Sequence, residues 1–211
     1  MLALRRGRPA TPRVRRAMPW TDARYVALDF ETTGLNYDTD HVISYGAVPV
    51  ERGRVLAGRG RHQLVRPPTQ PSPRSQTVHL LRPIDLAEAP PMRAVGPSFR
   101  AELDRRLILA WFADVEVAFL GKIFGGSARW WRRRVIDVRD LAIAVDEAPP
   151  GAKVERGYGL TQTAERYGVP VASPHEALDD AFVTAQLFVV LAGKLPGNPR
   201  PTVGDLLALG S

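Results

Sequence analysis

The chain has 211 residues, a formal net charge of +7 and 45% hydrophobic residues, which suits one domain with a full apolar core. It contains no cysteine, which excludes a disulfide framework, a thiolate zinc site and a cysteine nucleophile. No run of about 18 apolar residues is present, so the sequence predicts no membrane span. We therefore expect a cytoplasmic protein.

Positive charge is concentrated at the beginning of the chain, where residues 1–17 contain six arginines and no acidic residue. With Pro9 and Pro12 and no apolar periodicity, residues 1–22 are predicted to be a disordered leader. Three interpretations stay open: non-specific phosphate binding, a dispensable leader with translation starting at Met18, and an organelle transit peptide. The domain itself is expected at 23–195, with a C-terminal tail at 196–211.

Residues 25–35 begin as an apolar strand and end in a Thr-Thr-Gly turn. With a strand period of two, Asp29 and Glu31 leave the same face roughly 6.6 to 6.8 Å apart. Carboxylates on such an apolar strand are tolerated mainly when a cation or hydrogen-bond donors compensate them. The pattern therefore favours a divalent metal site over an acidic strand end in solvent.

The other elements follow from hydrophobic periodicity and from glycine and proline. We predict strands at His41–Val50, Arg54–Val65 and Val115–Leu120, helices at Ser98–Phe112, Leu160–Tyr167 and Pro174–Ala192, and a proline-rich loop at 66–97 with a short helical piece near Val78–Leu81. Three early strands followed by alternation predict an α/β fold with a mixed sheet.

The last long helix has a clear predicted start, because Ser173–Glu176 has the pattern of a capping box with proline at the first helical position. On this helix Asp180 lies at the edge of the apolar stripe, where a carboxylate needs a partner. The run Arg129–Arg134 (RWWRRR) has two interpretations: a surface for phosphates and bases, or core tryptophans beside solvated arginines.

Two segments resemble one family. LDFETTGLN with HVISYGAVPV after it, and HEALDDAFVTAQLF with YGLTQTAERYGVP before it, are similar to DEDD-superfamily 3′-5′ exonucleases of the histidine-containing branch, such as the epsilon proofreading subunit of bacterial DNA polymerase III. The resemblance covers roughly Ala23 to Leu207, including the region of His79. It implies a ribonuclease-H-like mixed sheet of about five strands with helices on both faces.

The resemblance also implies the catalytic residues. Asp29 would bridge two Mg²⁺ or Mn²⁺ ions, Glu31 would bind one of them, and Asp180 would complete the first metal site. His175 would be the general base. Hard divalent cations and oxygen ligands suit in-line displacement at phosphorus.

The turn after the first strand is expected to contact substrate. By the same resemblance, Thr32, Thr33, Gly34 and Leu35 would approach the terminal nucleotide, with Leu35 wedged against the last base. The implied activity is 3′-5′ exonucleolytic hydrolysis of single-stranded DNA or frayed 3′ ends, with RNA not excluded and a polymerase as a possible partner. The alternative is a catalytically impaired nuclease fold that binds nucleic acid or protein.

The second motif of the family departs from the pattern. If Val115–Leu120 is the fourth strand, the expected aspartate position falls on Phe124 or Gly125. The second ion would then be weakly held, and activity would be reduced. Three nearby acids are candidate substitutes, although none stands at the expected position: Asp114, Glu116 and Asp137.

Overall fold

The computed structural model describes residues 7–69, 81–146, 157–173, 175–196 and 200–209. The strands are β1 (Arg24–Thr32), β2 (Val42–Glu51), β3 (Arg54–Val55), β4 (Arg61–Leu64), β5 (Leu107–Ala110) and β6 (Val135–Asp137). The helices are η1 (Trp20–Asp22), η2 (Ala57–Arg59), α2 (Pro83–Ala87), α3 (Met92–Leu103), α4 (Asp114–Phe124), α5 (Ala128–Arg132), α6 (Val138–Val145), α8 (Leu160–Arg166), α9 (Ala177–Ala192) and α10 (Val203–Ala208). The helical piece predicted near Val78–Leu81 falls almost wholly outside the described residues.

The strands form one sheet in the order β3-β2-β1-β5-β6, and β4 also pairs with β2. β1 and β2 are antiparallel, whereas β1, β5 and β6 run parallel. This topology confirms the predicted mixed sheet with early antiparallel and later parallel strands. The predicted strand Arg54–Val65 is divided into β3 and β4 by η2, and the two pieces pair with opposite ends of β2.

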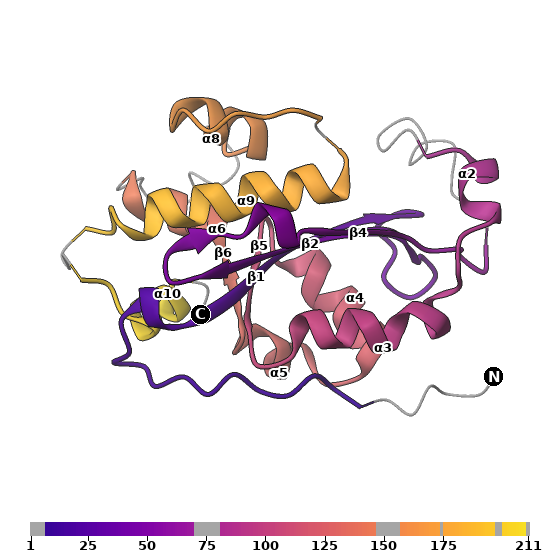
Figure 1. The fold of residues 1–211 in the computed structure, drawn as a ribbon, viewed down its shortest axis with the longest axis horizontal. Helices are drawn as coiled ribbons and strands as arrows, with labels where there is room; N and C mark the ends of the chain where they lie inside the picture. The colour runs from indigo at the N-terminus through magenta and orange to yellow at the C-terminus, as the bar shows by residue number, and fades with distance from the viewer. Residues whose placement is uncertain (1–6, 70–80, 147–156, 174, 197–199, 210–211) are drawn as a thin grey trace.

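Helices cover both faces of the sheet: in Figure 1, α8 and α9 lie above it and α3, α4 and α5 lie below it. The alternation of β1 matches these two layers. Tyr25 and Ala27 belong to the core on the α9 side, and Val26 and Leu28 belong to the core on the α3 and α4 side. Within the described residues, no helix is long and apolar enough for a membrane crossing.

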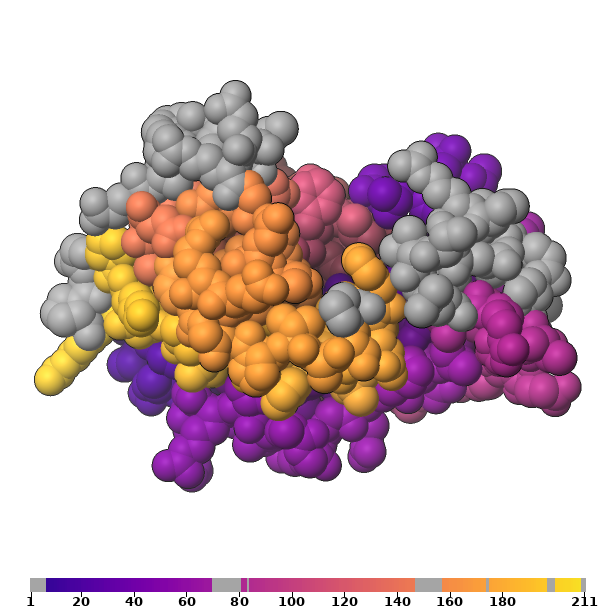
Figure 2. Space-filling view, turned by 90° about the horizontal axis from the view of Figure 1, so that it is seen from above, coloured from indigo at the N-terminus to yellow at the C-terminus, as the bar shows by residue number. Residues whose placement is uncertain are grey.

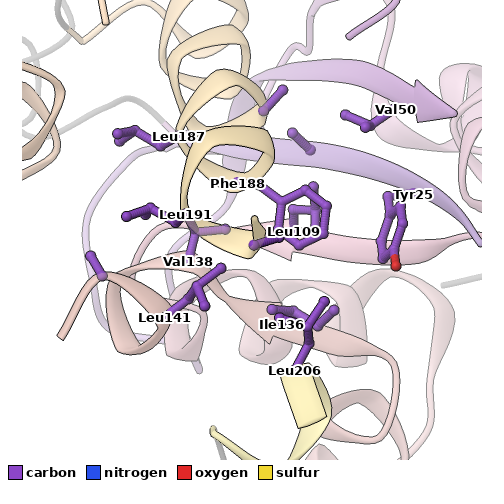
Figure 3. Packing of buried hydrophobic residues seen from close by; sticks show 14 of the residues in the cluster. Tyr25, Val50, Leu109, Ile136, Val138, Leu141, Leu187, Phe188, Leu191 and Leu206 are labelled. Atoms are coloured by element: carbon purple, nitrogen blue, oxygen red, sulfur yellow. The ribbon is translucent and has the colours of Figure 1, made fainter. Parts of the chain in front are cut away.

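The core on the α9 side is packed around Phe188 (Figure 3). The Phe188 ring lies 4.7 Å from the ring of Tyr25 and 5.4 Å from that of Trp20, centroid to centroid. The buried Tyr25 hydroxyl donates to the Trp20 carbonyl at 2.7 Å, so its polar atom is satisfied. This packing fixes the first half of β1 and thereby the direction of its acidic second half.

The segment from residue 92 to 124 differs from the prediction. Instead of a helix at Ser98–Phe112 and a strand at Val115–Leu120, the chain forms α3, then β5, then α4. All four residues of β5 are fully buried between the parallel strands β1 and β6, so they lack the alternation of a half-buried strand. In α4 the sequence Val-Glu-Val alternates apolar and acidic residues, as a half-buried strand would. The segment is helical instead, and Glu116 is buried.

Both ends of the described chain pack on the domain, whereas a disordered leader at 1–22 and a tail at 196–211 were expected. The Ala10 N–H donates to the Asp104 carboxylate at 2.7 Å, and the Arg105 N–H donates to the Ala10 carbonyl at 3.0 Å. Pro19 and Thr202 form an isolated β-bridge, and α10 adds two buried side chains to the core. Residues 7–22 and 200–209 are therefore part of the folded unit.

Candidate active site

The two carboxylates of β1 face the beginning of α9. Asp29 and Glu31 lie on the same side of the strand as Tyr25, beyond the point where the apolar core on that side ends. Across the antiparallel pair, Asp29 is in register with Gly46 of β2. The site therefore starts where the apolar face of β1 changes to an acidic one.

Gly46 allows α9 to approach the sheet. A Cβ atom at this position would lie 2.0 Å from the Ala177 carbonyl oxygen, closer than any side chain permits. The close approach brings Asp180, in the first turn of α9, to the β1 carboxylates. Oxygens of Asp29, Glu31 and Asp180 lie within 4.8 Å of one another, as a shared cation requires.

The start of α9 differs from the prediction, which began the helix at Pro174. In the structure the helix begins at Ala177, Glu176 is the N-cap residue, and no side chain caps it. His175 lies just before, with a positive φ of 65° that is incompatible with a helix. Its N–H donates to Asp180 Oδ2 at 3.1 Å, so the backbone just before α9 holds the Asp180 carboxylate. Pro174 is outside the described residues.

The acids of this cluster resist ionisation. Burial, followed by the charge of Asp180, raises the pKa of Asp29 to about 8. Burial, followed by the charges of Asp29 and Asp180, raises the pKa of Glu31 to about 9. Burial also raises the pKa of Asp180, although the N–H of His175 partly offsets it. Such carboxyls either hold protons or bind a cation near neutral pH.

A fourth carboxylate comes from the opposite face of the sheet. Glu116, in the first turn of α4, is 2% exposed, and within the described structure its Oε2 atom has no hydrogen-bond partner. Burial and then the charge of Asp29 raise its pKa well above the usual range, while the N–H groups of Glu116 and Phe30 lower it in part. Glu116 therefore lies against β1 beside Asp29, and its free oxygen is a further candidate ligand atom.

The other two acids weighed as substitutes have different partners. Asp114 forms an ion pair with Arg132 at the surface. Asp137 accepts hydrogen bonds from the N–H groups of Ala113 at 3.0 Å and Arg139 at 2.9 Å, so it caps α6 and holds the loop after β5. Of the three, Glu116 is the one whose carboxylate is buried beside Asp29 and retains a free oxygen.

The register assumed for the second motif is wrong. Phe124 is the last residue of α4 and packs against Phe99, with the ring centroids 5.4 Å apart. Gly125 follows with a positive φ of 74°. Both are at least eight residues beyond Glu116, or about 12 Å along a helix axis. A buried acid, Glu116, does lie one turn into α4, and the signal for it was a lone glutamate within an apolar helix.

The loop after β1 is held by its own side chains and by α4. The Thr33 hydroxyl donates to Asp40 at 2.7 Å, and the Thr32 hydroxyl donates to the Gly34 carbonyl at 2.8 Å. The ammonium group of Lys122, on α4, donates to three carbonyl oxygens of this loop, at residues 37, 38 and 40. The loop leaves Leu35 68% exposed. Of the four residues predicted to contact substrate, Leu35 is the one with a free side chain.

The basic and aromatic run Arg129–Arg134 is mainly structural. Trp131 is fully buried and donates to the Gly125 carbonyl at 2.9 Å, which confirms the core interpretation for this tryptophan. Arg134 is 2% exposed rather than solvated, and it donates to the Leu103 and Arg106 carbonyls at 2.9 and 3.1 Å. Its guanidinium ties α3 to β6.

The segments that carry these groups border a hollow. In Figure 2 the beginning of α9 (orange), the segment after β5 (pink) and the loop after β1 (violet) surround it. The arrangement combines partly buried acids, a nearby histidine backbone and an opening from the surface.

Comparisons with known proteins agree with this geometry. A sequence model of the exonuclease family, RNase_T, matches residues 26–188. DNA polymerase III of the PolC type from Thermotoga petrophila is 33% identical over 172 residues, which cover 80% of this chain and 12% of the polymerase. The 3′-5′ exonuclease DinG of Staphylococcus aureus is 26% identical over 189 residues, covering 89% of this chain and 20% of DinG. The chain thus spans a small part of these relatives.

The fold is also similar to that of a solved nuclease. The zinc-bound form of Escherichia coli ExoI in complex with single-stranded DNA superposes with a TM-score of 0.70 at 15% sequence identity, over 83% of this chain and 42% of the other. Residues 26–188, which the family model matches, contain the acids of β1, α4 and α9. The chain therefore belongs to the exonuclease family and is related to the DEDD-type 3′-5′ exonuclease domains that include the epsilon proofreading subunit.

Proposed function

We propose that the chain is a metal-dependent 3′-5′ exonuclease that hydrolyses single-stranded DNA from its 3′ end and releases nucleoside 5′-monophosphates. The observation that carries this proposal is the convergence of Asp29, Glu31 and Asp180 within 4.8 Å, from one strand and one helix far apart in the chain. Structural acids are rarely gathered in this way without a cation, because burying them together is unfavourable.

The donor set fits hard divalent cations. Three partly buried carboxylates and the buried Glu116 offer oxygen ligands, which suit Mg²⁺ or Mn²⁺. Asp29, Glu31 and Asp180 would hold one such ion, and Asp29 together with Glu116 would hold a second. When bound, two such ions stabilise the attacking and leaving oxygens of an in-line displacement.

His175 is the proposed general base. It lies outside the helix in an exposed position, and its N–H donates to Asp180 Oδ2 at 3.1 Å, which anchors the residue beside the cluster. An imidazole has a pKa suited to proton removal from water near neutral pH. The fixed backbone contact to Asp180 would keep this residue at the site while its side chain moves.

Leu35 is the proposed contact to the terminal base. It projects from a loop that its own threonines and Lys122 hold in place, so an exposed apolar side chain is presented at little entropic cost. The main-chain groups of Thr32, Thr33 and Gly34 complete this side of the proposed substrate site.

The premise for a weakly held second ion was the missing acid, and the buried carboxylate of Glu116 beside Asp29 supports a complete set of four acids instead. We therefore propose ordinary magnesium-supported activity rather than activity that needs manganese. The alternative of a binding module without catalysis rested on the same premise, and no observation in the described structure favours it. The similarity to PolC supports a polymerase as a partner, which co-purification with a polymerase of the same cell would test.

The test is degradation of labelled strands with magnesium. A 5′-labelled strand should shorten stepwise, a 3′-labelled strand should release its label first, and mass spectrometry should find 5′-monophosphates. Asp29→Asn should abolish both reactions. Parallel DNA and RNA strands of one sequence would decide the sugar preference, which depends on contacts to the 2′-hydroxyl.

The control is Asp179→Asn, which removes a neighbouring acid of α9 that lies outside the cluster. It should retain activity within about threefold, since surface substitutions away from a site have small effects. Release of the label from the 5′ end, or activity that survives Asp29→Asn, would contradict the proposal.

A further inference from the structure

Exposed apolar side chains gather near the acidic cluster. Among the described residues, four large hydrophobic side chains are exposed: Leu35, Tyr37, Ile84 and Phe112. Leu35 and Tyr37 follow β1 and Phe112 follows β5, so these three leave the sheet at the edge that bears the acids, whereas Ile84 belongs to α2. Exposed apolar groups at one edge mark a binding surface more often than isolated ones do.

Phe112 has an unusual backbone. Its φ is +63°, a left-handed conformation that a bulky aromatic residue rarely adopts. The conformation is maintained because the next N–H, that of Ala113, donates to Asp137 Oδ2 at 3.0 Å and because α4 begins at Asp114. The result is a ring that is 46% exposed, and strain of this kind is most often retained where it serves a site.

Arg139 lies against this ring. Its guanidinium carbon is 5.2 Å from the centroid of Phe112. Arg139 is in the first turn of α6, and its N–H donates to Asp137 Oδ1 at 2.9 Å. Asp137 thus accepts from the N–H of Ala113, next to Phe112, and from the N–H of Arg139, one through each carboxylate oxygen, so the backbones on both sides of the pair are held together between β5 and β6.

The pair lies at the same edge of the sheet as the acidic cluster. Phe112 follows β5 and stands four residues before the buried Glu116 of α4. Leu35 lies beyond the same end of β1 as the acids, on the loop that Lys122 holds. Exposed apolar side chains that follow two different strands, β1 and β5, therefore lie at the edge of the sheet that bears the acids.

We propose that Phe112 and Arg139 form a subsite for one nucleotide of a single strand, in which a base stacks on the open part of the Phe112 ring and Arg139 donates to a phosphate. An aromatic face with a guanidinium beside it supplies the two interactions that bind single strands without sequence preference. The direction of the strand in this subsite, with its 3′ end toward the acids, rests on the proposed function. The subsite itself can be established by strand binding alone.

Binding without turnover tests the subsite. The affinity of a 5′-labelled oligothymidylate is measured by fluorescence anisotropy with calcium in place of magnesium, and electrophoresis verifies that the strand stays intact. Phe112→Ala should weaken binding about 5- to 150-fold, the range for loss of one stacked base. Phe112→Trp should bind as tightly as the natural chain. Ile84→Ala, the matched exposed residue of α2, should change nothing.

Strands with one abasic nucleotide locate the contact. Removing the base that stacks on Phe112 should weaken strand binding by the natural chain but have little further effect on strand binding by Phe112→Ala. The two changes should therefore be non-additive at one strand position only. Arg139→Gln should reduce the slope of log affinity against log salt by about 1, whereas Arg133→Gln, at an exposed arginine just after α5, should not.

A second variant separates binding from folding. Asparagine tolerates positive φ, so Phe112→Asn should keep or raise the melting temperature while it weakens strand binding as alanine does. Unchanged affinity in both Phe112→Ala and Phe112→Asn, or additive effects at every abasic position, would overturn the subsite.

The outcomes for the two proposals differ. If the effects of the abasic position and of Phe112→Ala are non-additive but the protein cleaves no strand, the subsite is supported and the proposed activity is refuted. A chain that degrades strands from the 3′ end, with natural affinity and KM in both Phe112 variants, refutes the subsite and retains the activity. A natural chain that binds no single strand overturns the subsite.

Discussion

Replacing Glu116 by glutamine tests whether the acid of α4 belongs to the metal site. The substitution keeps the shape of the side chain and removes the charge beside Asp29. Loss of an outer-shell partner commonly costs about 10- to 100-fold in metal affinity or activity, and loss of a ligand should cost at least as much. We therefore expect magnesium-supported activity to fall at least about 100-fold.

The same change should affect stability in two opposite ways. Without metal, Glu116→Gln should raise the melting temperature above pH 7, because the buried carboxylate at 2% exposure no longer has to ionise or hold a proton. With magnesium at about 100 times its dissociation constant, binding stabilises the natural chain by about 2.7 kcal/mol. If the variant binds about 100-fold more weakly, that gain falls to about 0.4 kcal/mol.

For a chain of this size the difference corresponds to about 5 to 9 °C in the magnesium-induced shift of the melting temperature. Differential scanning fluorimetry over a magnesium titration measures it. Asp114→Asn is the matched control, because this acid is on the same helix turn but pairs with Arg132 at the surface. A normal magnesium shift in Glu116→Gln, with a lost shift in Asp114→Asn or Asp137→Asn, would refute the assignment.

Four further predictions follow from the fold and the site. Phe124→Asp should lower the melting temperature by well over 5 °C and should not raise activity, because it buries a charge in the α4 core; thermal unfolding and the strand assay check this. Lys122→Met removes three hydrogen bonds to the loop after β1, so steady-state kinetics should show KM for single strands raised about tenfold with kcat changed less. Gly46→Ala should displace α9, and calorimetry should find magnesium binding weakened in a chain that still folds. In the metal-free protein the raised pKa values of Asp29 and Glu31, to about 8 and 9, mean that the folded state keeps protons that the unfolded chain loses near pH 4. The free energy of unfolding should therefore fall as pH rises from about 4 to about 9, by at most about 1.4 kcal/mol per group and pH unit; urea unfolding with a chelator measures it, and a rise over this range would contradict the sign.

The sequence located the parts of the site that depend on local pattern. Asp29 and Glu31 could be assigned because a strand alternates, and the structure places both on one face as expected. Asp180 could be singled out because a carboxylate at the edge of an apolar helix stripe needs a partner, and it lies within 4.8 Å of the other two. Local spacing gave the direction of each side chain, whereas the role of Asp180 as a metal ligand came from the family resemblance.

Glu116 could not be assigned in this way, because its role depends on where β5 ends. The run of residues 107–110 is apolar at every position, and periodicity alone cannot distinguish a strand buried on both faces from a helix. The predicted strand began eight residues too late, at Val115, so the expected acid was also placed too late, at Phe124 or Gly125. These residues lie at the end of α4. The close approach of α9 at Gly46 was also out of reach, since it depends on contacts between elements.

The geometry of the sheet explains why acids from opposite faces can share one cation site. β1 and β5 are paired only as far as Ala27 and Leu109, so the last part of β1 has no parallel neighbour on that side. The first turn of α4 fills this gap, which is how Glu116 reaches Phe30 and Asp29 although the rest of α4 lies below the sheet (Figure 1). α9 approaches from above through Gly46. A cation bound at this edge would thus be held by elements of both layers, and the ionised acids alone would push those layers apart. Metal binding should therefore stiffen the contact between the two layers more than it stiffens either core.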